Sequence, residues 1–153
     1  MIAIVDYGMG NLRSVAKALE YVGAEPTVTS DPDAVAAADA VVLPGQGAFG
    51  AAMDRLNEAG MTQAVKDAIT GGKPYLGICL GLQLLFETSE EAPDAQGFGL
   101  LGGSVDMFQT DLKVPHMGWN QLVHRKTTPH FRSLEPEDYV YFVHSYYVAP
   151  TDS

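Results

Sequence analysis

Residues 73–87, KPYLGICLGLQLLFE, restrict the possible folds of this chain more than any other segment. A short apolar run, residues 74–78, follows a Gly-Gly pair and is typical of a buried strand. Leucines at helical spacing come directly after it, so the segment changes from strand to helix within a few residues. The junction, residues 77–81, reads G-I-C-L-G and is a cysteine counterpart of the G-x-S-x-G nucleophile elbow, whose sharp turn exposes the central side chain.

Cys79, in the middle of this junction, has two interpretations. The flanking glycines give the room that such a turn needs, and the N-terminus of the following helix favours a thiolate. A free cysteine is, however, commonly a buried structural residue. The motif alone leaves both interpretations open, and the glycine-rich loop described below makes the nucleophile the favoured one.

The composition is that of a single globular domain. At 153 residues the chain can bury a substantial core, and its one cysteine excludes an internal disulfide or a zinc site built on several thiolates. The net charge of −10 argues against nucleic acid or an anionic membrane as a partner. The sequence shows no secretory leader and no membrane-spanning run, so we expect a cytoplasmic protein.

Strands and helices alternate in the first part of the chain, up to residue 87. Apolar strands are predicted at residues 2–5, 26–29, 40–43 and 74–78, and helical patterns follow them. This alternation predicts βαβ units and a parallel sheet. Ligands of such sheets bind beyond the carboxyl ends of the strands, so we expect the loops at residues 6–10, 44–47 and 79–81 to share one edge.

The composition changes after residue 87. Residues 89–103 are rich in glycine, proline and acidic residues and are predicted to be a connection. Short β segments are predicted at residues 105–108, 113–116, 120–123 and 139–148. We expect these strands, antiparallel or mixed, at the edge of the same sheet, so that residues 1–153 form one domain.

Pro44-Gly45-Gln46-Gly47 is a glycine-rich turn between a predicted strand and a helix. Its backbone N–H groups could bind an anion, although the turn is too short for a phosphate-binding P-loop. A plain strand-to-helix turn is the alternative. Beside Cys79, a donor from this turn and the N–H of Leu80 would together form an oxyanion hole.

A general base is not identified by the local sequence. The chain has four histidines, His116, His124, His130 and His144. His144 lies in an aromatic strand pattern, which favours a hydrogen-bonded structural role over that of a base. The pattern around His116 favours the same role. Met117 and Trp119, beside His116, are typical of a recognition surface. The other two histidines lie in a polar stretch and are expected to be solvated.

Together these motifs resemble those of the triad-type (class I) glutamine amidotransferases. Residues 77–83 and 44–47 carry this resemblance. Residues 4–12 (IVDYGMGNL), 115–120 (PHMGWN) and 142–147 (FVHSYY) are similar to segments of the glutaminase subunit of imidazole glycerol phosphate synthase, in histidine biosynthesis. The resemblance covers essentially the whole chain. It implies an α/β flavodoxin-like domain of three layers with a mostly parallel sheet and antiparallel edge strands.

The resemblance implies hydrolysis of L-glutamine to glutamate and ammonia. Cys79 would attack the side-chain amide carbon and form a γ-glutamyl thioester. The backbone N–H of Leu80 would serve the oxyanion hole, and the N–H of Gln46 would join it after a peptide reorients. Contacts with the bound glutamine are implied for Gly45, Gly47, Gln83, Ser145 and Tyr146.

The resemblance also implies a partner, the (β/α)₈-barrel cyclase subunit of imidazole glycerol phosphate synthase. This partner would use the ammonia to make imidazole glycerol phosphate and AICAR. The implied interface residues are Asn11, His116, Met117, Gly118, Trp119 and Asn120. The family implies no cofactor and no metal.

One feature departs from the pattern of the family. Its general base and the residue that orients it, a His and a Glu in a His-Pro-Glu-like motif, follow the strand that contains Tyr146. No such motif occurs before Ser153. We therefore expect a domain that is incomplete at its C-terminus and, as this chain alone, nearly inactive.

Three other functions are compatible with parts of the sequence. One is the glutaminase of another class I enzyme, such as that of anthranilate or pyridoxal phosphate synthesis, although residues 115–120 argue against it. A second is a non-catalytic module that binds a partner, because the base is absent. A third is a cysteine hydrolase of the intracellular peptidase or chaperone type, which would lack the contacts at Gln83, Ser145 and Tyr146.

Overall fold

The computed structural model describes residues 1–123, 133–135 and 137–152. Contacts divide the chain into two compact units. The first unit comprises Met1–Met107 and the residues from Tyr147 onward, and the second comprises Phe108–Tyr146. Each unit is described by itself. His124 and His130, expected to be solvated, lie outside the described residues.

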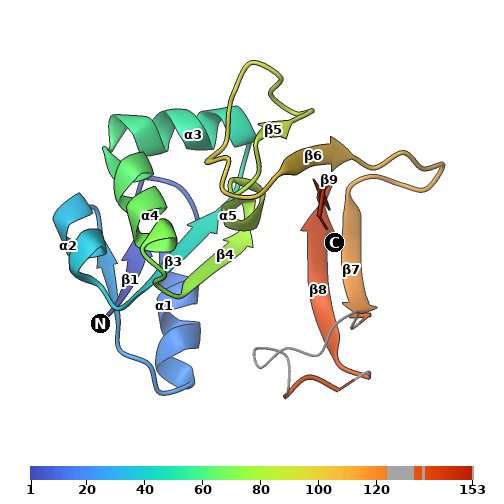
Figure 1. Ribbon diagram of the computed structural model, residues 1–153. Coiled ribbons are helices and arrows are strands. Elements are labelled where there is room, and N and C mark those ends of the chain that lie inside the picture. Colours follow the sequence, from blue (N-terminus) through green and yellow to red (C-terminus); the bar gives the residue numbers. More distant parts are fainter. Residues whose placement is uncertain (124–132, 136, 153) are drawn as a thin grey trace. The chain divides into compact units, whose positions relative to one another are not determined.

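A four-stranded parallel sheet forms the centre of the first unit (Figure 1). Its strands lie in the order β2-β1-β3-β4. Their bounds are Pro26–Thr29 for β2, Ile2–Val5 for β1, Ala40–Gly45 for β3 and Tyr75–Cys79 for β4. All four predicted strands are therefore confirmed. In β1 the side chains of Ala3, Ile4 and Val5 are all buried, as expected for a strand covered on both faces.

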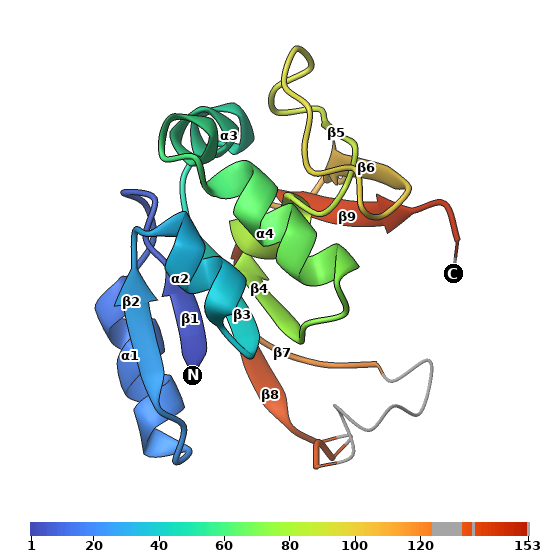
Figure 2. The same ribbon diagram turned by 60° about the vertical axis from the view of Figure 1, so that its left-hand side comes forward.

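Four helices cover the two faces of this sheet. They are α1 (Leu12–Tyr21), α2 (Pro32–Ala37), α3 (Phe49–Glu58) and α4 (Met61–Thr70). Helices α2, α3 and α4 pack together on one face, and α1 lies on the other (Figures 1 and 2). The predicted α/β class with a mostly parallel sheet is confirmed, and helix–sheet–helix layering follows from it.

The starts of these helices are set by capping groups. Asn11 Oδ1 accepts a hydrogen bond from the Ser14 N–H at 3.2 Å and caps α1. Asp31 caps α2 in the same way. No side chain adjacent to α3 caps it, and the Glu91 carboxylate, distant in sequence, accepts a hydrogen bond from the Phe49 N–H at 2.7 Å instead.

The core of the first unit lies between the sheet and helices α2 to α4. Its largest fully buried side chains on these helices are Val35, Phe49, Leu56, Met61 and Val65. Helix α1 has an apolar stripe but no buried residue. The core is therefore built mainly on one face of the sheet.

The remaining strands belong to two small sheets. β5 (Thr88–Ser89), β6 (Gly103–Met107) and β9 (Tyr146–Pro150) form one in the order β5-β6-β9, and β7 (His116–Gln121) pairs with β8 (Tyr139–His144) in an antiparallel hairpin. We expected these strands at the edge of the parallel sheet, and among the described residues none pairs there. The assignment of residues 1–153 to one domain stays a prediction. No helix in the described part of the chain is long and apolar enough to cross a membrane.

Candidate active site

The predicted elbow is present between β4 and α5 (Leu80–Gln83). Cys79 ends the strand, precedes the helix and has φ 54° and ψ −111°. Among the described residues it is the only non-glycine residue with a positive φ. Its side chain is exposed. A strained backbone that presents a reactive side chain is typical of functional sites.

Close backbone packing explains the glycines around Cys79. A Cβ at Gly81 would lie 1.9 Å from the carbonyl oxygen of Leu43 in β3, and a Cβ at Gly77 would lie 2.6 Å from the backbone of Gly81. At Gly45 a Cβ would lie 2.8 Å from the Cβ of Leu80. Because contacts below 3 Å are not tolerated, only glycine fits these three positions.

The three predicted loops meet at one edge of the sheet. The register of β3 and β4 pairs Gly45 with Cys79. A Cβ at Gly10 would lie 3.4 Å from the backbone of Pro44, and one at Gly47 would lie 3.1 Å from the Cε of Met9. The prediction that residues 6–10, 44–47 and 79–81 share an edge is therefore confirmed.

Two tyrosines near this edge, the buried Tyr7 and the partly buried Tyr75, were missed by the sequence analysis. The Tyr7 hydroxyl donates to the Pro44 carbonyl at 3.1 Å, and the Tyr75 hydroxyl donates to the Gly81 carbonyl at 2.7 Å. Burial, with the neighbouring Cys79, raises the pKa of Tyr7 to about 12. Burial also raises the pKa of Tyr75 well above its usual range. Both phenols therefore stay protonated and act as donors at neutral pH.

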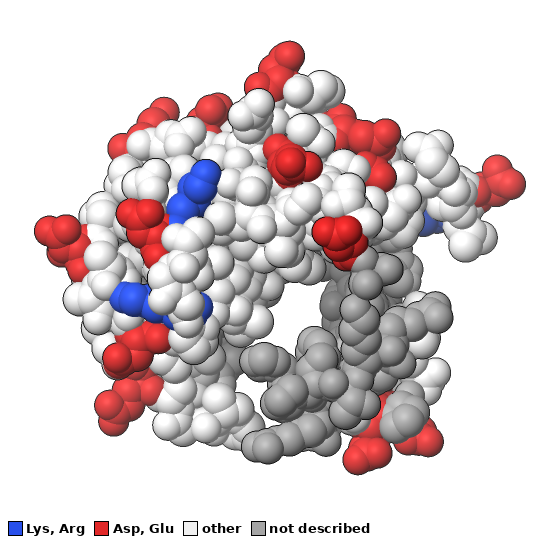
Figure 3. All heavy atoms as spheres, viewed as in Figure 1, with Lys and Arg blue, Asp and Glu red and all other residues white. Residues whose placement is uncertain are grey.

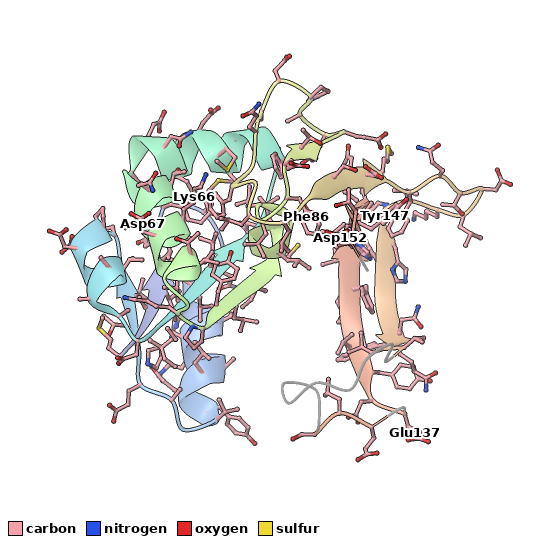
Figure 4. The ribbon with its side chains drawn as sticks, viewed as in Figure 1. Lys66, Asp67, Phe86, Glu137, Tyr147 and Asp152 are labelled. Atoms are coloured by element: carbon pink, nitrogen blue, oxygen red, sulfur yellow. The ribbon has the colours of Figure 1, made fainter. Side chains whose placement is uncertain are left out.

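The helix after the elbow is shorter than predicted. The pattern predicted a helix up to Glu87, and α5 ends at Gln83, which lies one turn beyond Cys79. The carbonyls of Leu84 and Leu85 accept hydrogen bonds from the connection, at Phe98, Leu100 and Leu101, instead of continuing the helix. Phe86, labelled in Figure 4, is buried below this connection.

Ser145 and Tyr146 belong to the second unit, at the turn between β8 and β9. The Phe108 N–H donates to the Ser145 carbonyl at 3.1 Å. The Tyr146 carbonyl accepts a hydrogen bond from Nδ1 of His144 at 2.9 Å. Both carbonyls of this turn are therefore held within the second unit.

His116 and His144 form a hydrogen-bonded pair. Because the Nδ1–H of His144 faces a carbonyl, its Nε2 is the acceptor for the Nδ1–H of His116, at 3.2 Å. The rings of Phe108 and Phe142 pack against both imidazoles. The hydrogen bonding expected of His144 is therefore confirmed, and His116 shares it.

One face of the β7–β8 hairpin carries a row of exposed apolar side chains, here called the hairpin stripe: Met117, Trp119, Tyr139, Tyr141 and Val143. The register places Trp119 opposite Tyr141, and their rings pack edge to face with centroids 5.6 Å apart. Trp119 remains 69% exposed. A stripe of this kind is typical of an interface rather than of a free surface.

Charge does not gather at a single place on the face shown in Figure 3. Acidic side chains are scattered over it, and lysines and arginines are few, as the net charge of −10 requires. The described ion pairs of side chains, Lys17–Glu20 and Arg55–Glu58, are exposed pairs within helices. Neither described side-chain ion pair involves the residues around Cys79.

Comparison with known proteins is consistent with this geometry. The sequence profile described as "Glutamine amidotransferase class-I" matches residues 3–153. The chain therefore belongs to the class-I glutamine amidotransferase family.

Among curated relatives, the similarity is to proteins called "Imidazole glycerol phosphate synthase subunit HisH". The relative from Thermosynechococcus vestitus is 54% identical, and the match covers 99% of this chain and 73% of the relative. The relative from Bacillus cereus is 52% identical, and the match covers 96% of this chain and 70% of the relative. The relative from Syntrophotalea carbinolica is 51% identical, and the match covers 100% of this chain and 78% of the relative.

One solved structure, "Crystal structure of glutamine amidotransferase", has a TM-score of 0.66 and 20% identity. The match covers 79% of this chain, and the chain spans 64% of that structure's chain. At this level of identity the likeness concerns the fold alone. The roles of individual site residues stay predictions.

Proposed function

We propose that this protein is the glutaminase subunit of an imidazole glycerol phosphate synthase. It hydrolyses L-glutamine and supplies ammonia to a cyclase partner. The observation that carries the proposal is the exposed Cys79 in a strained elbow, with Gly45 of the glycine-rich loop paired beside it. The HisH relatives supply the particular enzyme. The cytoplasmic location and the heterodimer are part of the same proposal.

Cys79 attacks the side-chain amide carbon of glutamine as a thiolate. The sulfur–carbon bond forms while the carbonyl oxygen takes the negative charge. The N–H of Leu80, at the start of α5, and the N–H of Gln46, after its peptide turns, donate to that oxygen. The carbon–nitrogen bond then breaks and the nitrogen leaves as ammonia after taking up a proton. Water attacks the remaining thioester and releases glutamate and the thiol.

Five further residues are proposed to contact the substrate. Gly45 and Gly47 approach from the loop, and Gln83 lies one turn beyond the nucleophile. Ser145 and Tyr146 contribute from the turn that the second unit holds in place. The described histidines do not include an assigned base, because His116 and His144 hydrogen-bond to each other.

The cyclase partner is a (β/α)₈ barrel that docks on the hairpin stripe and its neighbours. The proposed contacts are Asn11, His116, Met117, Gly118, Trp119 and Asn120. Exposure of Met117 and Trp119 supports this assignment, because a free surface rarely carries such a row of apolar side chains. The relatives' name, a synthase subunit, also implies a second subunit.

The test is covalent labelling by a glutamine-analogue electrophile, 6-diazo-5-oxo-L-norleucine. We expect one adduct per chain, on Cys79, and protection by L-glutamine. Cys79→Ser should abolish the adduct, since the chain has one cysteine. An adduct on another residue, or a rate that glutamine does not lower, would refute the proposal. The probe needs no turnover, so it is informative even if glutamate release is slow.

A further inference from the structure

The edge of the parallel sheet holds a buried phenol that the reaction above does not use. Tyr7 lies in the loop after β1, is 4% exposed and donates its only hydroxyl proton to the Pro44 carbonyl at 3.1 Å. Pro44 directly precedes Gly45 and Gln46, the residues of the proposed oxyanion loop. The Tyr7 hydroxyl is thus in direct contact with the base of that loop.

The hydrogen bond fixes a whole peptide group and not only one oxygen. The carbonyl of Pro44 and the N–H of Gly45 belong to the same planar unit, so an anchored carbonyl also sets the direction of that N–H. A Cβ at Gly45 would lie 3.0 Å from the Tyr7 hydroxyl oxygen, which shows how closely the phenol adjoins this peptide. The first peptide that can turn is therefore the one between Gly45 and Gln46, where the chain becomes exposed.

Loss of the phenol hydroxyl would release this peptide. Pro44 is buried, so its carbonyl would lose its donor in a place with little access to water. A buried acceptor without a donor is costly, and the backbone relieves the cost by turning toward another donor. That turn would involve the same loop that must present the Gln46 N–H to the substrate.

We propose that Tyr7 is a positioning residue that anchors the Pro44–Gly45 peptide and confines rotation of the oxyanion loop to the peptide that follows. The proposal rests on the proposed glutaminase function. Tyr7 does not touch glutamine in this scheme; it acts through the direction of the Gln46 N–H. Because the pKa of Tyr7 is raised to about 12, the donor proton is present throughout the neutral range.

The experiment compares two reagents that react with the same thiol. With 6-diazo-5-oxo-L-norleucine, the diazo carbon takes up the proton of the thiol, the sulfur bonds to that carbon and dinitrogen leaves. The neighbouring ketone oxygen occupies the oxyanion site. With methyl methanethiosulfonate, the sulfur bonds to a sulfur and methanesulfinate leaves, with no carbonyl involved. The ratio of the two labelling rates therefore reports on the oxyanion loop and not on the thiol itself.

For Tyr7→Phe we expect the norleucine rate to fall about tenfold, the size of effect that loss of one hydrogen bond gives. The methanethiosulfonate rate should change less than about twofold by the same argument, since it needs no oxyanion donor. The matched control is Tyr21→Phe, a phenol on α1 that is 92% exposed, and it should change neither rate. Circular dichroism verifies that the variants are folded.

A second variant keeps the proton and the ring in place. Trifluorotyrosine introduced at position 7 alone ionises at lower pH than tyrosine, so the rate ratio should fall at a lower pH than in the unmodified protein. A purely structural role of the ring would leave this pH profile unchanged.

Three outcomes would overturn the proposal. An unchanged ratio in Tyr7→Phe would show that the loop does not depend on the phenol, while labelling of the unmodified protein leaves the glutaminase function standing. An equal fall with both reagents would show that Tyr7 acts on the thiol. Absence of norleucine labelling in the unmodified protein would refute the proposed function, and this inference with it.

Discussion

Cys79 has a positive φ, a backbone conformation that residues with a side chain seldom adopt. The residues around it hold it in this conformation. Such a conformation costs about 1–3 kcal/mol by itself. Here the strand before Cys79 and the helix after it pack so closely that Gly77 and Gly81 leave no space for a Cβ. Packing of the surrounding backbone thus maintains the strain at Cys79, the proposed nucleophile.

The contact between Gly81 and β3 predicts a large and specific loss of stability. Gly81→Ala would place a Cβ 1.9 Å from the Leu43 carbonyl oxygen, which belongs to the sheet backbone and cannot easily move. We expect a loss of about 3 kcal/mol in the free energy of unfolding, measured in urea.

The control for this variant is Gly8→Ala. Gly8 has φ 83° but nothing within 4 Å of its Cβ position, so only the backbone penalty of about 1–2 kcal/mol applies. Gly81 itself has no positive φ, so a loss for Gly81→Ala no larger than that for Gly8→Ala would contradict the predicted cost of close packing.

Individual site residues differed in how far the sequence could predict them. The cysteine and its glycines were recognisable because their spacing is local. Tyr7 and Tyr75 were not, because each donates to a backbone carbonyl. Every residue has a backbone carbonyl, so the acceptor cannot be recognised from the sequence. A tyrosine two residues after a buried strand, as at position 7, was the only available signal.

At the scale of the element, the β7–β8 hairpin separates two kinds of side chain by its alternation. His116, Phe142 and His144 share one face, where they pack and hydrogen-bond. The hairpin stripe occupies the other and is exposed. One face of the hairpin is therefore packed within the second unit, and the apolar side chains of the other face are exposed.

Trp119→Ala should weaken binding of the cyclase partner. Removal of a large aromatic side chain from an interface commonly costs about 2 kcal/mol or more, which corresponds to about 30-fold in Kd. The fold should lose only the contact with Tyr141, so the unfolding midpoint should change little. Isothermal titration of the two subunits gives the affinity.

Leu112→Ala is the matched control, because Leu112 is 79% exposed, lies in the same unit and is not part of the stripe. Its affinity should equal that of the unmodified protein. Equal affinities for Trp119→Ala and the unmodified protein would place the partner elsewhere.

Elements with local patterns were predicted well, and those with distant partners were not. The strands of the parallel sheet and helices α1 to α4 have clear periodicity, and α1 and α2 also have capping residues, Asn11 and Asp31. Helix α5 stops early because the carbonyls of the residues that follow it, Leu84 and Leu85, bond to residues beyond position 97. The C-terminal strands were recognised as strands, but their choice of sheet depends on pairings far apart in sequence.

At the scale of the whole molecule, the chain divides into two units, and residues with proposed roles occur in each. The first unit contains Cys79 and the loop at residues 44–47, and the second contains Ser145 and the hairpin stripe. The sequence predicted the α/β class of the first unit. It did not predict the division into units, because no composition change marks the boundaries near Phe108 and Tyr146.

Stability at high pH is a whole-molecule consequence of the buried phenols. The pKa of Tyr7 is about 12 in the folded state against 10.0 for an ordinary tyrosine. Its raised pKa means that the neutral form is favoured by folding. This stability is fully present below pH 10.0 and is lost as pH rises toward about 12.

We therefore expect the melting temperature to fall as the pH rises above 10.0, and to fall less steeply in Tyr7→Phe. The slope of the free energy of unfolding should differ by at most about 1.4 kcal/mol per pH unit, the limit for one proton. Tyr21→Phe removes an exposed phenol and controls for the growing negative charge. Parallel curves of melting temperature against pH for the unmodified protein and Tyr7→Phe would contradict the prediction.

Glu91 gives the proposed oxyanion loop a second fixed end. Its carboxylate binds the Phe49 N–H at the start of α3, just as Tyr7 binds the Pro44 carbonyl at the end of β3. Only residues 45–48 lie between these two hydrogen-bonded ends. Ordering a free backbone costs about 1–2 kcal/mol of conformational entropy per residue. Because both ends of this loop are already ordered when the chain folds, most of that entropy is lost before glutamine binds. Little of the entropy cost is then left to oppose substrate binding.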